Sequence, residues 1–319
     1  MSAKLPVGPT INEAFQFGLN RWITAVRFGW LPVVVISILF VAFFATAFKT
    51  EAFLALESGG AEPQGLKDIV RAPLPVFFAG TAVLYVVTVL LISGVIASLF
   101  RLVALGEERP GLFHLRVDGP AMRVFLAYLI LGVLSFVVMG LAMCIGGLLA
   151  GQSPAQGLQA IGHLFAFAMN AQPGQQPPAN MLESLSVALK PVMLGGLIGA
   201  VPLIYLNVKL TPFPAGSAAE NRLLLFGAFR MTFGHFWSIF GVYVLFFLAA
   251  VIMGIIFQLV GAIVSLIAEF GAAQGGALAF VGAILALAVS VAALWFQFFM
   301  MAVQYAIPAI VYRRLKIGA

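Results

Sequence analysis

The side chains best suited to acid–base chemistry gather in one polar stretch between two apolar segments. Glu107, Glu108, His114 and Asp118 are the clustered candidates, and a carboxylate beside a histidine is a common general acid–base pair. Glycine and proline recur through the same stretch, which is typical of turns on a charged surface. No nucleophile, metal motif or glycine-rich phosphate loop accompanies them, so we expect no catalytic residue and no enzyme activity.

Neutral polar side chains inside apolar segments form a second group of candidates. Gln258 lies in the fifth apolar segment, and Gln297 and Gln304 lie two helical turns apart in the sixth. Such residues either hydrogen-bond between neighbouring helices or line a polar pathway, and the sequence leaves both interpretations open. The middle of the apolar segments carries no ionisable residue, which weighs against proton- or ion-coupled transport.

Arginines near the ends of apolar segments form the third group. Arg101, Arg222 and Arg230 each lie close to a segment that is long enough to cross a membrane. They either only set the orientation of the spans or also bind anionic lipid headgroups, an attraction worth about 1 kcal/mol per basic residue. We expect all three to lie near the inner headgroup plane.

The composition of the chain places these groups in a membrane. Of its 319 residues, 62% are hydrophobic and 9% are charged, and the mean hydropathy is +1.09. Soluble domains carry about 25% charged residues, so we expect an integral membrane protein. The net charge of +6 is dispersed along the chain, which argues against a nucleic-acid partner. The single cysteine, Cys144, excludes an intrachain disulfide, and no Cys/His spacing predicts a metal or cofactor.

Six apolar segments predict an all-α, polytopic bundle of six transmembrane helices. A span needs about 20 apolar residues to cross the hydrocarbon core, and the first four segments fit this length. The last two are longer, and we expect a projecting helical hairpin turned at residues 271–276 rather than breaks near Gly254 and Gly261. The segments are residues 31–48, 75–100, 124–149 and 191–208, followed by one that starts near Phe236 and one that starts near Ala277.

Local patterns predict further helices at the membrane surface. Thr10 with Glu13, and Ser217 with Glu220, match the capping box that begins a helix. We expect residues 1–29 to form an amphipathic helix, which lies either on the membrane or against the protein itself.

The remaining segments complete a single integral membrane domain over residues 1–319. Residues 158–168 have an amphipathic pattern within a long loop, which predicts a second interfacial helix. The six spans occupy residues 30–312, and residues 313–319 form a basic tail.

Two interface motifs resemble those of a known group of proteins. Phe17-Gly-x-x-Arg21 precedes the first span, and Arg230-Met-Thr-Phe-Gly-His-Phe-Trp-Ser-Ile-Phe-Gly-Val-Tyr243 leads into the fifth. Together they resemble uncharacterised bacterial six-helix membrane proteins and, more distantly, the membrane domain joined to some glycerophosphodiester phosphodiesterases. The resemblance implies a bacterial inner-membrane location, the six-helix architecture and a connection with lipid. No catalytic residue carries over, because the phosphodiesterase domain has no counterpart in this sequence.

These patterns favour a non-enzymatic membrane protein that serves as a lipid-contacting scaffold or accessory subunit. Its expected partners are membrane lipids, anionic ones among them, and either another membrane protein or a second copy of this chain. The alternative is a channel-like or lipid-translocating permease that uses the three glutamines as a polar strip.

The distribution of basic residues predicts the orientation of the spans. Most of the 17 lysines and arginines fall at the two termini and in the second and fourth loops, all on one side of six spans. Basic residues concentrate on the cytoplasmic side of membrane proteins. We therefore expect both termini to lie in the cytoplasm, which agrees with an even number of spans.

This topology predicts the location of five reporter fusions. Fusions at Ala61, Gln175 and Gln274 should report the outer side, because the three loops that contain them carry only four of the 17 basic residues together. Fusions at Gly111 and Gly216 should report the cytoplasmic side. A paired phosphatase and fluorescent-protein assay would check this, and one exchanged pair would overturn the topology.

Overall fold

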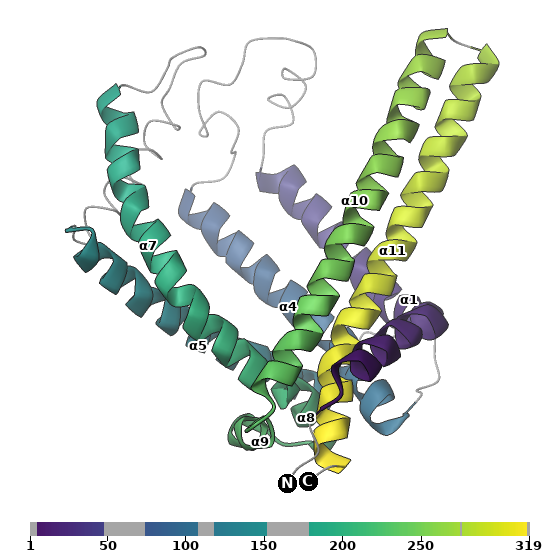
Figure 1. The fold of residues 1–319 in the computed structure, drawn as a ribbon. Helices are drawn as coiled ribbons and strands as arrows, with labels where there is room; N and C mark the ends of the chain where they lie inside the picture. The colour runs from purple at the N-terminus through teal and green to yellow at the C-terminus, as the bar shows by residue number, and fades with distance from the viewer. Residues whose placement is uncertain (1–4, 48–73, 108–117, 152–178, 275, 318–319) are drawn as a thin grey trace. The chain divides into compact units, whose positions relative to one another are not determined.

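A computed structural model of the chain describes residues 5–47, 74–107, 118–151, 179–274 and 276–317 (Figure 1). Every regular element in these ranges is a helix, which confirms the predicted all-α class. Six helical stretches are long and apolar enough to cross a membrane, so the chain is a multi-pass membrane protein. The helices are α1 (Val7–Ala47), α4 (Leu74–Leu105), α5 (Gly119–Leu149), α7 (Ala179–Lys209), α8 (Pro212–Glu220), α9 (Leu225–Met231), α10 (Phe236–Gln274) and α11 (Gly276–Ile317).

Contacts between residues divide the chain into two compact units, and the expected single membrane domain stays a prediction. Unit 1 contains Met1–Pro32, Ile92–Ala127 and Val208–Ala319, and unit 2 contains Val33–Leu91 and Tyr128–Asn207.

Within unit 1, α10 and α11 form the long helical hairpin that the sequence predicted. They lie side by side and antiparallel, since the Phe257 ring stacks on Phe296 with centroids 4.7 Å apart and Gly282 lies against Ala268 (Figure 1). Helix α10 has 39 residues and continues through Gly254 without a break. At 1.5 Å per residue it is about 58 Å long, well beyond the roughly 30 Å hydrocarbon core.

The first part of α1 packs on α11, and whether it also lies on the membrane stays a prediction. A Cβ atom at Gly18 would lie 2.5 Å from Cγ2 of Val303, so glycine is what allows the two helices to approach this closely. The Phe15 and Phe299 rings meet beside it, with centroids 6.1 Å apart. The helix therefore packs on the protein itself.

The N-terminal helical stretch joins the first span through a kink, and the Thr10 capping box is wrong. Helix α1 begins at Val7 and runs into the first span through a kink at Arg21, where φ is −124° and ψ is 15°. Thr10 lies inside the helix, fully buried, and its hydroxyl donates a 2.6 Å hydrogen bond to the Pro6 carbonyl. Instead of capping the helix, the Glu13 carboxylate forms an ion pair with Arg314 at 2.8 Å.

The second capping box is also wrong, because α8 ends where the sequence predicted a new helix to begin. Helix α8 starts at Pro212, and proline suits the first helical position because its fixed φ is helical and its missing N–H needs no partner. Ser217 therefore lies in the interior of α8, fully buried, and Glu220 is its last residue. The preceding helix, α7, stops at Lys209.

The predicted basic tail belongs to α11, which continues to Ile317. Its last turns include Arg313, Arg314 and Lys316, all with carboxylate partners. The predicted loop helix at 158–168 lies outside the described residues.

Unit 2 contains a close contact between two helices at Gly195 and Gly199. A Cβ atom at Gly195 would lie 2.7 Å from the Cα atom of Met143 on α5, and one at Gly199 would lie 3.0 Å from Ala142 Cβ. Small residues let membrane helices approach until their backbones touch. Helices α5 and α7 pack in this way.

The neighbouring glycines of α7 offer a matched test of this contact. Gly195→Ala should destabilise the protein by about 1–3 kcal/mol, because the new methyl group meets a backbone that cannot rotate away. Gly196→Ala should be neutral or slightly stabilising, because a Cβ atom there meets nothing within 4 Å and alanine favours helix. Unfolding of the two variants in detergent would compare them, and equal stability would contradict the packing of α5 on α7.

Candidate functional site

The short helix α8 is largely buried within unit 1. All residues from Pro212 to Ala218 are buried. A Cβ atom at Gly216 would lie 3.0 Å from the Tyr312 ring, so α8 packs closely against the end of α11. A buried helix end leaves backbone carbonyls without helical partners, and these need hydrogen bonds from elsewhere.

Arg101 of α4 provides one of these hydrogen bonds. Its Nη1 donates to the Ala218 carbonyl at 3.0 Å, while Nε and Nη2 bind the Glu107 carboxylate at 2.9 and 3.0 Å. Helix α4 ends at Leu105, and Gly106 follows with φ of +69°, a left-handed conformation that glycine adopts readily. This turn brings Glu107 back to Arg101. The arginine therefore joins α4 to α8, and only 13% of its side chain is exposed.

Asn221, the residue after α8, provides a second connection. Its φ of +56° ends the helix in the left-handed conformation, which asparagine tolerates better than most residues. Its Oδ1 atom accepts a 3.0 Å hydrogen bond from Nη1 of Arg123 on α5.

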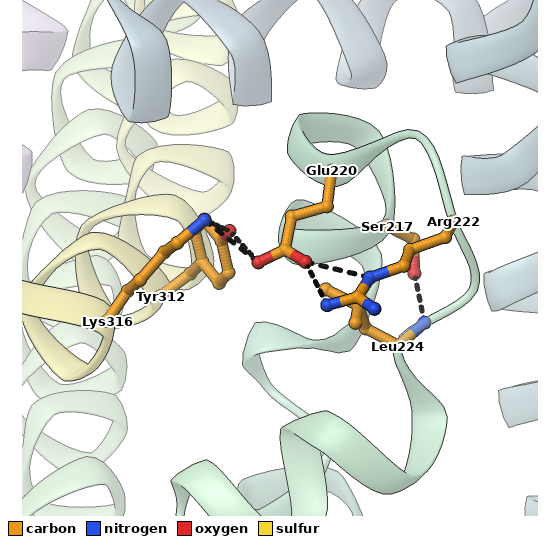
Figure 2. A network of polar contacts seen from close by, with 6 residues as sticks. All are labelled: Ser217, Glu220, Arg222, Leu224, Tyr312 and Lys316. Carbon is orange, nitrogen blue, oxygen red and sulfur yellow. Dashed lines mark hydrogen bonds and ion pairs between the residues drawn. The ribbon is translucent and has the colours of Figure 1, made fainter. Parts of the chain in front are cut away.

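Glu220 connects α8 to α11 (Figure 2). The Tyr312 hydroxyl donates to its Oε1 atom at 2.7 Å, and the Lys316 ammonium lies 3.0 Å from the same oxygen. Arg222 binds the other oxygen, Oε2, at 2.7 Å. We call Arg101, Arg123, Glu220, Asn221, Tyr312 and Lys316 the α8 network, because their contacts all converge on the C-terminal end of that helix.

Helix α9 is held at both of its ends. The Ser217 hydroxyl donates to the Phe213 carbonyl at 2.7 Å and accepts the Leu224 amide at 3.1 Å, which ties the start of α9 to α8 (Figure 2). At the other end, the Lys209 ammonium donates to the Thr232 carbonyl at 3.1 Å, and the Thr232 hydroxyl lies 3.0 Å from the Lys209 carbonyl. The Lys209 side chain that makes this contact is buried.

The segment from Arg222 to Trp237 exposes aromatic and basic side chains together. Phe226, Phe233 and Trp237 are among the most exposed large side chains of the protein, and Arg222 and Arg230 accompany them. Aromatic rings beside basic residues are typical of the boundary between hydrocarbon and headgroups.

The three arginines that the sequence grouped together occupy two different environments. Arg101 is largely buried and bound to α8, whereas 70% of the Arg222 side chain is exposed and Arg230 is exposed in the last turn of α9. Arg222 and Arg230 thus flank one surface segment. Arg101 is not part of that surface and holds α8 in place.

The intramembrane glutamines lie on the surface of the α10–α11 hairpin. Gln258, Gln297 and Gln304 are all exposed, which places them outside the core of unit 1. Both interpretations of these residues, hydrogen bonding between helices and a polar pathway, stay predictions.

Two of the four acid–base candidates, Glu107 and Asp118, have structural partners. Glu107 binds Arg101, and Oδ1 of Asp118 accepts the Ala121 amide at 3.1 Å as the cap of α5. Glu108 and His114 lie outside the described residues. Within the described ranges, no group of three His, Cys, Asp or Glu side chains could hold a metal ion.

Comparisons with protein-family models, with curated proteins and with solved structures found no match. The fold therefore defines the class directly, as an all-α integral membrane protein with six helices able to span a membrane.

The two environments of the arginines predict different consequences of the same substitution. Arg101→Gln should destabilise the protein by about 2 kcal/mol, because it removes hydrogen bonds to a charged group and leaves the Ala218 carbonyl unpaired. Arg222→Gln should cost less than about 0.5 kcal/mol, because an exposed ion pair contributes little. Denaturant unfolding in one detergent would compare them. Equal losses in the free energy of unfolding would contradict the prediction that the buried arginine matters more for stability than the exposed one.

Proposed function

We propose that this protein is a non-enzymatic scaffold or accessory subunit of the bacterial inner membrane that contacts anionic lipid headgroups through α9. The observation that carries the proposal is the exposed face around α9, where Phe226, Phe233 and Trp237 accompany Arg222 and Arg230. The aromatic rings suit the upper acyl chains and the guanidinium groups suit phosphate oxygens.

The place of α9 in the chain supports this role. It lies in the connection between α7, which ends at Lys209, and α10, which begins at Phe236. A short connection between two spans stays near the membrane surface, where headgroups lie. The positive-inside rule puts this connection on the cytoplasmic side.

The rigidity of the segment supports a binding surface rather than an incidental loop. The contacts of Ser217 and Thr232 hold both ends of α9 before any lipid arrives. Preorganised groups lose less conformational freedom on binding. Two basic residues contribute about 1 kcal/mol each near an anionic surface, which is enough to enrich a lipid but not to bind it tightly.

The scaffold proposal explains more of the described residues than the permease alternative does. A permease needs a polar pathway, and the glutamines that suggested one are exposed on α10 and α11. Two of the four acid–base candidates have structural partners, which favours a role other than catalysis.

The α9 surface predicts selective loss of anionic lipid. The double variant Arg222→Gln/Arg230→Gln should retain phosphatidylglycerol and cardiolipin at least about fivefold less than the wild type, since each arginine contributes about 1 kcal/mol. Native mass spectrometry of protein extracted in mild detergent would measure this.

The matched control removes two basic residues from the predicted outer side, as Arg71→Gln/Lys190→Gln. It should keep the retention of the wild type, because the proposed lipid surface lies on the other side. Equal retention by both double variants, with unchanged topology, would eliminate the α9 surface as a lipid site.

A further inference from the structure

Two groups of positive charge lie at the two ends of the segment that carries α9. The first lies at the end of α8, where Arg222 and Lys316 share the carboxylate of Glu220 (Figure 2). The second is Arg230, in the last turn of α9. Helix α9 lies between the two groups and has seven residues, which make it about 10 Å long. Two separate anions can therefore meet this segment, one at each end.

The first group carries more positive charge than its carboxylate neutralises. Arg222 binds Oε2 of Glu220 through Nε at 2.9 Å and Nη2 at 2.7 Å, and the Lys316 ammonium lies 3.0 Å from Oε1. The neighbouring ion pair at this helix end, Arg101 with Glu107, is balanced by itself. Two cations thus share one carboxylate, and the positive charge in excess attracts a further anion.

Both cations of this group keep donors that can reach a further anion. The exposed fraction of the side chain is 70% for Arg222 and 56% for Lys316, against 18% for Glu220. Nη1 of Arg222 takes no part in the contact with Glu220. The Lys316 ammonium donates to Glu220 and to the Tyr312 hydroxyl, which leaves its third N–H for a ligand. Guanidinium and ammonium donors both suit phosphate oxygens.

The second group offers a separate contact. Arg230 is exposed, and among the residues that the structure describes no carboxylate pairs with its side chain. The exposed ring of Phe226 lies in the chain between the two groups, and that of Phe233 follows Arg230. Such rings suit the upper part of acyl chains. The ligand that matches this segment carries two phosphates, each next to acyl chains.

We propose that the α9 surface prefers lipids of the cardiolipin class, in which one glycerol joins two phosphates that both carry acyl chains. One phosphate lies against Arg222 and Lys316, and the other lies against Arg230. This inference rests on the proposed lipid contact of α9 and adds Lys316 to it as a residue that determines specificity. A lipid with one phosphate occupies one group at a time, whereas the link between two phosphates makes the second contact intramolecular.

The test measures the preference for cardiolipin over phosphatidylglycerol. The full-length protein in mild detergent is offered both lipids at equal total phosphate, and native mass spectrometry measures what it retains. The wild type should retain cardiolipin at least about fivefold more than phosphatidylglycerol, as one further basic contact predicts.

Two single substitutions should each remove this preference. Lys316→Gln leaves Arg222 balanced by Glu220, and Arg230→Gln leaves only the group at the end of α8, so both should reduce the ratio below about twofold. Lys316→Arg keeps the charge and should keep the ratio. The matched control is Lys190→Gln, which removes one exposed positive charge from the predicted outer side and should also keep the ratio.

Glu220→Gln separates lipid recognition from a merely structural role of Lys316. The substitution removes the carboxylate charge but keeps an amide oxygen that can accept the Tyr312 hydroxyl. Retention of both lipids should rise about fivefold, because Arg222 and Lys316 then lack a negative partner. If Lys316 only held α8 in place, Glu220→Gln would lower retention instead, and that result would overturn its role in lipid recognition.

Failure of this inference differs from failure of the α9 proposal. Equal retention of the two lipids by the wild type, or an unchanged ratio in Lys316→Gln, would overturn the two-phosphate site. Loss of both lipids by Arg222→Gln/Arg230→Gln would still support the α9 contact in that case. No loss in that double variant would instead eliminate the α9 surface itself.

Discussion

The C-terminal end of α8 has to be satisfied inside the protein, because its residues through Ala218 are buried and water cannot reach its last carbonyls freely. Basic side chains from three other helices therefore meet at this helix end. Arg101 binds the Ala218 carbonyl, Arg123 binds Asn221, and Lys316 binds Glu220. Positive charge at a helix C-terminus also complements the helix dipole, so the same groups contribute twice.

This requirement explains why the basic residues of the protein do not act alike. Those of the α8 network hold α4, α5 and α11 around a short helix, and each donates hydrogen bonds to a fixed partner. Arg230 and the exposed part of Arg222 remain at the surface, beside the aromatic side chains of α9. The rigid network thus supports the surface at which we propose an electrostatic contact with lipid. The proposed lipid function depends on this division of roles between similar side chains.

The two ends of the chain meet for a related reason. Helix α1 approaches α11 closely because Gly18 has no side chain, and Glu13 is then within reach of Arg313 and Arg314. Ion pairs that are partly shielded from water are stronger than exposed ones, although removal of one partner leaves the other charge costly to keep.

The amino-acid sequence by itself determined the class of the protein, because burial in lipid requires long apolar helices and composition alone reveals them. It also predicted the helical hairpin, since the hairpin depends on two long apolar segments that lie next to each other in the chain. The two capping boxes failed because Ser/Thr-x-x-Glu is a weak local pattern, and Pro212 began α8 before Ser217 was reached. Only the tertiary structure decided what Glu13, Glu220 and Arg101 do. Their partners Arg314, Tyr312 and Ala218 are far away in the sequence, and no local pattern specifies which charged side chain folding will bring to which carbonyl or carboxylate.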